Sequence, residues 1–275
     1  MSGRKAFIPL EIRKQKACPE SQTLFLTGFT LVELLVVIAV VAILMAILLP
    51  ALEFARKQSQ AVVCMSNIKQ WSYCWLLYLN DHEGRFPSGA DASGDWPDKL
   101  RPYYKQRGAL TLCPSATTPY TEGGAIPFGA WRWTPDGGGW TGFESKPGED
   151  YGSYGLNEWL GDRDNENFWG NDDQEKANNI PMFFDCVVWD VYCSDTEAPP
   201  DVEGMVTNEM HLVCINRHNG YINMVFLDLD VRKVGLKELW TLKWHRNFDT
   251  AGPWTLAGGA QSSDWPTWMR KFKDY

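Results

Sequence analysis

Hydrophobic residues dominate one long run near the start of the chain. The run covers the 21 residues 29–49, and every side chain from Leu34 to Leu49 is apolar. At about 1.5 Å of rise per residue it would make a helix of roughly 30 Å, which is long enough to cross a bilayer. The run is longer than the apolar core of a secretory signal peptide, and Pro50-Ala-Leu-Glu follows it instead of a small-residue cleavage site. The pattern therefore predicts a transmembrane helix.

A helical repeat continues beyond Pro50, but there the apolar residues keep to one broad face. They recur in alternating steps of four and three, and lysine, glutamine and asparagine side chains occupy much of the remaining surface. The stripe consists of Ala61, Met65, Ile68, Ser72, Trp75 and Leu79, widened by Cys64, Trp71 and Tyr78. It predicts an amphipathic helix that packs on a globular head and ends at Asp81–Gly84, where glycine can terminate it. The stripe is too short for a coiled coil.

The remaining chain alternates turn signals with short apolar segments. Residues 84–180 are rich in glycine and proline, which predicts loops on a small scaffold. Buried strands are predicted at Met182–Tyr192 and His211–Ile215, and a hairpin joins Ile222–Leu227 to Val231–Val234. A short packed helix is predicted from Leu236 to Phe248, where apolar residues have helical spacing.

Charge is distributed unevenly around the apolar run. The chain has a formal net charge of −8, yet residues 1–28 hold five basic and two acidic side chains, which leaves −11 for the rest. A basic tip ahead of an apolar span predicts a cytoplasmic amino terminus and an acidic head on the other side of the membrane. Such a head lacks the basic face that nucleic acid binding requires, so no nucleic acid partner is expected.

Six of the seven cysteines lie beyond the apolar run. An oxidising compartment would permit up to three disulfides among them, and a mixture of bridged and simply buried thiols is equally compatible with the sequence. No C-x-x-C pair occurs, which argues against a zinc ribbon and against a thioredoxin-like redox site.

Glu33 is the one charged residue within the apolar run. A carboxylate in a membrane helix costs about 2.5 to 3.5 kcal/mol at the centre and less near the end, so it usually has a partner. No basic residue lies within two helical turns of Glu33. An ordinary signal anchor would leave this residue unexplained.

Residues 28–33, Gly-Phe-Thr-Leu-Val-Glu, resemble the processing site of type IV prepilins and type II secretion pseudopilins. The resemblance implies that a dedicated peptidase cuts after Gly28 and methylates the new terminus at Phe29. It also implies that Glu33, the fifth residue of the mature chain, pairs with the terminal amine of a neighbouring subunit. Pro50 matches a helix-loosening proline of the family. The leader of 28 residues is longer than most leaders in that family.

A second resemblance extends into the head. Cys64-Met-Ser-Asn-Ile-Lys-Gln resembles one pilin-like group whose periplasmic domain bears an H-x9-D-G motif, and His218 and Asp228 have the spacing of that motif. Leu229 replaces the glycine, so a turn that is longer or of another type is expected, because leucine takes positive φ only with strain. Cys113-Pro resembles the Cys-Pro segment of the group. The resemblance implies a disulfide between Cys64 and Cys113, with two separate buried thiols as the alternative.

The sequence offers little support for an enzyme. Neither a G-x-S-x-G elbow nor an H-E-x-x-H helix is present. His218 and Asp228 could act as a base and its orienting partner, but a structural role in closing the hairpin is the favoured interpretation.

Two candidate ligand sites occur in the head. Asp162, Asp164 and Glu166 alternate oxygen ligands as calcium loops do, but an EF-hand would have glycine where Asn167 stands, and a solvated acidic loop is the favoured alternative. Trp131, Trp133 and Trp140 lie together in a glycine-rich stretch and could stack on sugars, although burial in a core is the commoner fate of tryptophan. No cofactor is expected from the sequence, and calcium is the one alternative for which it gives a reason.

These patterns together predict an α+β, pilin-like protein, with a long helix, transmembrane then amphipathic, packed on a small antiparallel sheet with long loops. Its parts are a leader (1–28), a transmembrane half-helix (29–50), an amphipathic half-helix (51–83) and a periplasmic or extracellular head (84–275). The expected function is a structural subunit of a type IV pilus or type II secretion pseudopilus. Its expected partners are the prepilin peptidase/methyltransferase, other pilin or pseudopilin subunits and inner-membrane assembly machinery. A membrane-anchored ligand- or glycan-binding protein is the alternative.

Overall fold

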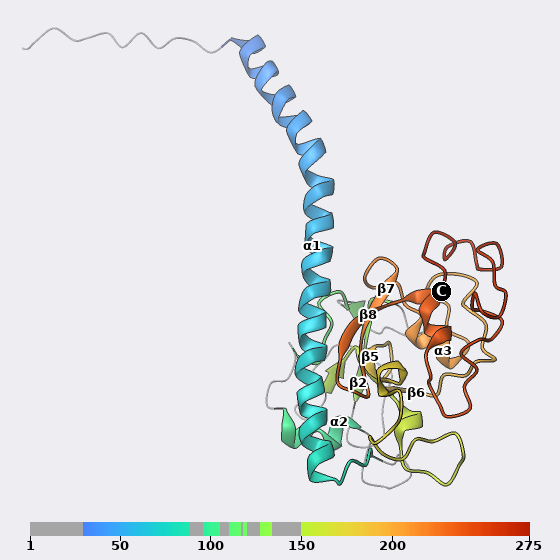
Figure 1. The fold of residues 1–275 in the computed structure, drawn as a ribbon. Coiled ribbons are helices and arrows are strands. Elements are labelled where there is room, and N and C mark those ends of the chain that lie inside the picture. The colour runs from blue at the N-terminus through green and yellow to red at the C-terminus, as the bar shows by residue number, and fades with distance from the viewer. Residues whose placement is uncertain (1–29, 88–95, 105–109, 117, 120–126, 134–149) are drawn as a thin grey trace, which may run out of the picture. The chain divides into compact units, whose positions relative to one another are not determined.

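The computed structural model describes residues 30–87, 96–104, 110–116, 118–119, 127–133 and 150–275. By its internal contacts the chain divides into two compact units, residues 1–50 and residues 51–275. One long helix, α1 (Leu31–Asp81, 51 residues), runs through both units, as the apolar run and the amphipathic stripe predicted. Figure 1 shows the order of the elements along the chain.

The first unit contains the apolar part of α1. Its large side chains from Leu31 to Leu49 are exposed in the structure, although they are leucine, isoleucine, valine and methionine. Among the described residues, α1 is the helix that is long and apolar enough to cross a membrane. Such exposed apolar surface is unfavourable in water and favourable in lipid, which agrees with the predicted transmembrane segment.

In the second unit, the amphipathic part of α1 buries the predicted stripe. Ile68, Trp71 and Trp75 are fully buried, and Trp71 packs against Phe183 of the sheet with ring centroids 5.5 Å apart. The helix ends as predicted: Gly84 has a φ of +75° and donates its N–H to the carbonyl of Leu79 at 2.8 Å. A side chain at position 84 would be strained and would collide with Asp172.

The strands form two sheets within the second unit. The smaller sheet has the order β1-β2-β3, and the larger has the order β6-β4-β5-β7-β8. The pairs β1–β2 and β4–β6 are parallel, and the other pairs are antiparallel. The strands are β1 (Thr118–Pro119), β2 (Gly129–Trp133), β3 (Asp150–Gly152), β4 (Tyr154–Asn157), β5 (Pro181–Asp185), β6 (Asp190–Val191), β7 (Tyr221–Phe226) and β8 (Val231–Gly235).

The core lies on both faces of the larger sheet. Along β7, Val225 joins the cluster that contains the buried face of α1, whereas Met224 and Phe226 join a second cluster. This alternation is the period of two expected of a strand. The second cluster is completed by C-terminal residues, among them Trp244 and Trp265. Figure 1 shows the C-terminal part of α1 alongside the sheet. The α+β prediction of a long helix on a small, mainly antiparallel sheet is thus confirmed.

Several short elements differ from their predictions. Residues 182–192 form two strands, β5 and β6, instead of one. Residues 211–215 are not a strand, because most of them lie in the helix α3 (Glu209–Val213), which the Asn208 side chain caps by accepting the N–H of His211 at 3.0 Å. The helix predicted from Leu236 is a 3₁₀ helix, η4 (Leu236–Thr241). The other short helices are α2 (Trp96–Lys99), η1 (Arg101–Tyr103), η2 (Glu158–Leu160) and η3 (Ala177–Asn179).

The β7–β8 hairpin is confirmed, and its turn explains how leucine replaces glycine. The N–H of Leu229 donates to the carbonyl of Phe226 at 2.8 Å, and the N–H of Phe226 donates to the carbonyl of Asp230 at 2.9 Å. The loop is therefore longer than a two-residue turn, as expected. The expectation that leucine would avoid a positive φ in this turn was wrong, however, because Leu229 itself adopts a φ of +65°. Its side chain packs against the cluster around α1, and its carbonyl accepts a hydrogen bond from the Lys69 ammonium at 3.1 Å.

Candidate functional site

Glu33 lies in the first turn of α1 and is bound to the residue that starts the helix. One carboxylate oxygen, Oε2, accepts the backbone N–H of Thr30 at 2.8 Å and its hydroxyl at 2.7 Å. In return, the N–H of Glu33 donates to the hydroxyl oxygen of Thr30 at 3.2 Å. This reciprocal arrangement is a capping box, which satisfies backbone donors that have no partner within the helix. Glu33 therefore has a partner in its own chain, which the sequence analysis missed, although Thr-x-x-Glu is the usual signature.

The capping box leaves one oxygen of the Glu33 carboxylate available for a further hydrogen bond. Both bonds from Thr30 reach Oε2, and Oε1 has no hydrogen-bond partner among the described residues. The positive end of the helix dipole also favours an anion at this position. Gly28 and Phe29 lie outside the described residues, so their predicted processing is a statement about sequence alone. Pro50 lies inside α1, where it has no N–H to donate, and the predicted loosening of the helix there stays a prediction.

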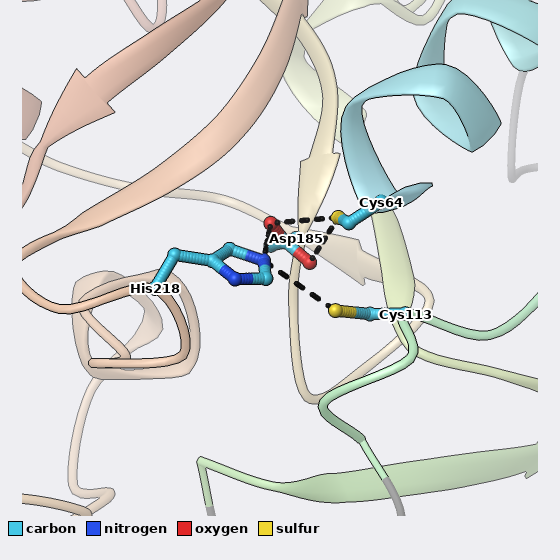
Figure 2. A group of neighbouring side chains, drawn as sticks. All are labelled: Cys64, Cys113, Asp185 and His218. Carbon is cyan, nitrogen blue, oxygen red and sulfur yellow. Dashed lines mark hydrogen bonds and ion pairs between the residues drawn. The ribbon is translucent and has the colours of Figure 1, made fainter. Parts of the chain in front are cut away.

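In the head, four side chains with metal-ligating or catalytic chemistry converge. Cys64 comes from α1, Cys113 from the segment 110–116, Asp185 from the end of β5 and His218 from the loop before β7 (Figure 2). Their donor atoms all lie within 4.8 Å of one another, and all four residues are buried. Cys64 Sγ is 3.3 Å from both carboxylate oxygens of Asp185. His218 Nε2 is 3.2 Å from Asp185 Oδ2 and 3.4 Å from Cys113 Sγ.

A second layer of polar groups holds these side chains in place. The backbone N–H of Asn223 donates to Asp185 Oδ2 at 2.9 Å, and the Asn223 amide donates to the carbonyl of Ala61 on α1 at 3.1 Å. The Tyr154 hydroxyl donates to Cys64 Sγ at 3.6 Å. Arg217 lies 3.4 Å from Asp185 Oδ1, and both side chains are fully buried. The cluster is thus linked to α1, to the sheet and to a buried cation.

These contacts shift the pKa values of the four groups in different directions. Burial by itself would raise the pKa of Cys113, but hydrogen bonds with Cys64 and His218 and the charge of Arg217 lower it to about 6. Burial, reinforced by Cys113 and Asp185, raises the pKa of Cys64 well above its ordinary value. The charge and hydrogen bond of Asp185 outweigh burial and raise the pKa of His218 to about 9. His218 and Arg217 likewise lower the pKa of Asp185 to about 2, against the effect of burial. The contacts of the cluster therefore favour the ionised form of Asp185 and the protonated form of His218, and they make Cys113 the more acidic of the two thiols.

The predicted pairing of His218 with Asp228 is wrong. His218 precedes β7 and Asp228 follows it, so the six residues of this strand separate them. His218 pairs with Asp185 instead, while Asp228 is exposed and accepts the N–H of Asp230 at 3.0 Å. The ten-residue spacing therefore places a buried histidine at one end of a strand and a turn residue at the other.

Cys64 and Cys113 are neighbours, as the resemblance implied, but the structure holds both as free thiols. The other cysteines beyond the apolar run, Cys74, Cys186, Cys193 and Cys214, are also free and buried. The predicted disulfide is therefore not present in this structure, and the pairing stays a prediction.

The candidate calcium loop does not bring its carboxylates together. Asp162, Asp164 and Glu166 lie around a surface hollow, and Asp162 pairs with Arg85 at 3.6 Å with both side chains exposed. Among the described residues, the donor atoms that converge closely are those of the buried cluster. Calcium binding by the acidic loop stays a prediction.

The three tryptophans proposed to face a sugar do not form a described surface. Trp131 is buried and donates its indole N–H to the carbonyl of Tyr154 at 2.9 Å, so its role is structural. The side chain of Trp133 and the whole of Trp140 lie outside what the structure describes.

Three members of the buried cluster were candidates from the sequence, with Cys64 paired to Cys113 and His218 paired to Asp228, whereas Asp185 was not recognised. A signal for Asp185 did exist, because it is a lone carboxylate in the apolar segment Phe-Phe-Asp-Cys-Val-Val at 183–188. A charge in such a segment is seldom buried unless it is paired.

Comparison with known proteins identifies a motif in the amino-terminal segment. Residues 27–49 match the prokaryotic N-terminal methylation motif. No curated protein and no solved structure matches the chain. The match covers Gly28, Phe29 and Glu33 and coincides with the exposed apolar part of α1. This motif and the long apolar helix that carries it make the amino-terminal segment of the chain type IV prepilin-like.

Proposed function

We propose that the chain is a structural subunit of a pilin-like filament, of the type IV pilus or type II secretion pseudopilus kind. Prepilin peptidase cleaves it after Gly28 and methylates Phe29, and the mature subunits then assemble through the amino-terminal part of α1. The methylation motif over residues 27–49 is the observation that carries this proposal. The protein is a substrate of processing chemistry and not itself an enzyme.

The geometry at Glu33 supports a role in assembly. The capping box uses Oε2, so Oε1 can accept the charged amine of a neighbouring subunit while the helix start stays intact. In lipid such an ion pair is strongly favoured over a lone carboxylate. Glu33 would thus have two functions, one within its own helix and one between subunits.

The apolar helix supports an inner-membrane, single-pass location before assembly. We propose that the leader is cytoplasmic and the head periplasmic, because the basic residues cluster ahead of the span. Within a filament, the exposed apolar side chains of residues 31–49 would pack against those of other subunits, and inner-membrane assembly machinery would extract each subunit from the bilayer.

The first test is the amino terminus of the protein purified from its native membrane. Mass spectrometry of the terminal peptide should give N-methylphenylalanine from Phe29 in place of a leader of 28 residues. An intact leader on a chain that stays monomeric would overturn the proposal and would favour a membrane-anchored ligand-binding protein.

A pair of variants separates the two functions of Glu33. Glu33→Gln keeps a hydrogen-bond acceptor for Thr30 but removes the negative charge. Cleavage should therefore continue, while incorporation into filaments should fall at least about tenfold. A tenfold fall corresponds to the loss of an interaction worth about 1.4 kcal/mol. Thr30→Ala removes the hydroxyl that caps the helix and keeps the charge, so incorporation should largely persist. Equal loss in both variants would mean that capping, and not pairing between subunits, explains Glu33. Sheared filaments and membrane fractions, each probed for the head, provide the measurement.

A further inference from the structure

The buried cluster of Cys64, Cys113, Asp185 and His218 has the donor set of a metal site. Two cysteines, a histidine and a carboxylate are ligands that zinc accepts, and structural zinc sites use four protein ligands in a closed tetrahedron. The four residues come from four separate segments of the fold, and their donor atoms lie within 4.8 Å of one another. Figure 2 shows the four side chains directed toward one another.

The distances between donor atoms agree with a tetrahedron. With Zn–S bonds of about 2.3 Å and Zn–N or Zn–O bonds of about 2.0–2.1 Å, neighbouring donors of a tetrahedral zinc lie about 3.3–3.8 Å apart. In the structure His218 Nε2 and Asp185 Oδ2 are 3.2 Å apart, Cys113 Sγ and His218 Nε2 are 3.4 Å apart, and Cys64 Sγ and Asp185 Oδ2 are 3.3 Å apart. The other pairs of donor atoms in the cluster lie within 4.8 Å of one another.

The charges also balance. Two thiolates and one carboxylate around a divalent ion, with a neutral histidine, leave one negative charge. The buried guanidinium of Arg217, 3.4 Å from Asp185 Oδ1, supplies one positive charge. A charge-neutral group can be buried at far lower cost than a charged one. Arg217 would then be the outer partner that orients a ligating carboxylate, as such partners commonly do in metal sites.

Burial argues against catalysis by the same residues. A cysteine, histidine and aspartate in contact could form a nucleophile and its base, but the side chains of His218 and Asp185 are 0% exposed, and Cys64 and Cys113 are 0% and 1% exposed. No substrate can reach a thiol in that position without opening the core. A disulfide would use both sulfurs and leave the carboxylate and the imidazole to each other, whereas a metal ion would engage all four groups.

We propose that Cys64, Cys113, Asp185 and His218 bind one structural zinc ion. Zinc is favoured because thiolate and imidazole donors in a tetrahedral arrangement are typical of it. Binding requires both cysteines as thiolates and His218 as the neutral imidazole, so it releases protons from the cluster. The ion would tie α1 to the end of β5 and to the loops that carry Cys113 and His218, and so would stabilise the packing of the amphipathic half-helix on the head.

Metal analysis of the full-length chain tests the site. The protein, purified in detergent without chelator and dialysed against trace zinc, should contain one zinc per chain by elemental mass spectrometry. Cys113→Ser and Asp185→Asn should each weaken zinc binding at least about tenfold, since even outer-shell changes cost that much. Cys214→Ala is the matched control, because Cys214 is another buried thiol outside the cluster, and Asp164→Asn controls for the acidic loop. Both controls should keep the full zinc content.

Cobalt substitution keeps the test decisive if the ligand variants fail to fold. Wild-type protein loaded with Co²⁺ should show the intense visible absorption and the thiolate-to-cobalt charge-transfer band of a tetrahedral, sulfur-ligated ion. Removal of the ion with a zinc-selective chelator should lower the melting temperature by at least about 5 °C, because site formation is coupled to folding.

Absence of zinc and of the cobalt spectrum, or a Cys64–Cys113 disulfide in the mass spectrum of the native protein, would overturn the proposal. Zinc retained by folded Cys113→Ser would do the same. None of these results depends on filament assembly.

Discussion

Two carboxylates interrupt apolar segments of this chain, and each is stabilised in a different way. Glu33 is held by a neighbour three residues away, through the capping box with Thr30. Asp185 is held by residues far away in sequence, among them His218 and Arg217. In both cases the charge is tolerated because hydrogen bonds or cations replace the water that was lost. The positions of such carboxylates are therefore the most informative single residues in the sequence.

Leu229 provides a prediction about backbone strain. A non-glycine residue in the left-handed region costs about 1–2 kcal/mol, and Leu229 has a φ of +65° in the hairpin turn. Leu229→Gly should relieve this strain while it loses the partial burial of the side chain, so the free energy of unfolding should change by less than about 1 kcal/mol. Urea unfolding of the full-length protein in detergent, followed by tryptophan fluorescence, provides the measurement.

Leu227 is the matched control for this prediction. It lies two residues away, is buried and does not have a positive φ. Leu227→Gly removes a packed side chain without relieving strain and should cost at least about 3 kcal/mol. Equal destabilisation by the two substitutions would show that the turn stores no strain at Leu229.

At the scale of elements, Arg217 connects the two sheets. Its guanidinium donates to the carbonyls of Gly129 in β2 at 2.9 Å, of Ser153 between β3 and β4 at 2.6 Å, and of Cys186 after β5 at 2.9 Å. Lysine cannot reproduce this fork of donors. Arg217→Lys keeps the positive charge but leaves buried carbonyls without a donor, so it should destabilise the protein by at least about 2 kcal/mol, since each unsatisfied buried acceptor costs about 1–3 kcal/mol.

Arg85→Lys is the comparison for the change at Arg217. Arg85 pairs with Asp162 at 3.6 Å, and both side chains are more than half exposed. This exposed pair should contribute less than about 1 kcal/mol. Thermal unfolding of both variants, followed by circular dichroism, measures the difference. If Arg217→Lys proved as mild as Arg85→Lys, the guanidinium would not be what joins the sheets.

Local patterns predicted the elements whose repeats are long. The stripe from Ala61 to Leu79 predicted α1 and its end, and the two apolar segments that flank residues 228–230 predicted the β7–β8 hairpin. Predictions from short apolar segments failed, because periodicity over five residues cannot distinguish a strand from a helical turn. At residues 211–215 the Asn208 cap decided the outcome.

The buried cluster was beyond sequence reasoning for a different reason. Cys64 and Asp185 are 121 positions apart, and Cys113 and His218 are 105 positions apart. No local motif links such residues, because only the packing of α1 on the sheet brings them together. The amino-terminal motif, in contrast, lies within one continuous segment, and the predicted prepilin-type segment is confirmed by the match over residues 27–49.

At the scale of the whole molecule, orientation in the membrane depends on few charges. Within about 15–20 residues of the apolar run, where the positive-inside rule applies, the leader carries Arg13, Lys14 and Lys16. The other side carries Arg56 and Lys57, with Lys69 at the limit of this window. The bias toward a cytoplasmic leader is therefore small. Changes of a few leader residues should reverse it.

We expect Arg13, Lys14 and Lys16, all changed to glutamine, to shift a large fraction of the chains to the opposite orientation. An alkaline phosphatase fused after Tyr275 is active only outside the cytoplasm, so its activity per fusion protein should fall, while a fluorescent protein at the same point should gain signal. Arg270, Lys271 and Lys273, changed together to glutamine, remove the same charge far from the span and should leave the orientation unchanged. If the leader variant still exported the head fully, transport of the acidic head, and not the basic leader, would set the topology. Under the proposed processing by prepilin peptidase, the inverted fraction should also stay uncleaved, because the peptidase can act only on a leader that faces it.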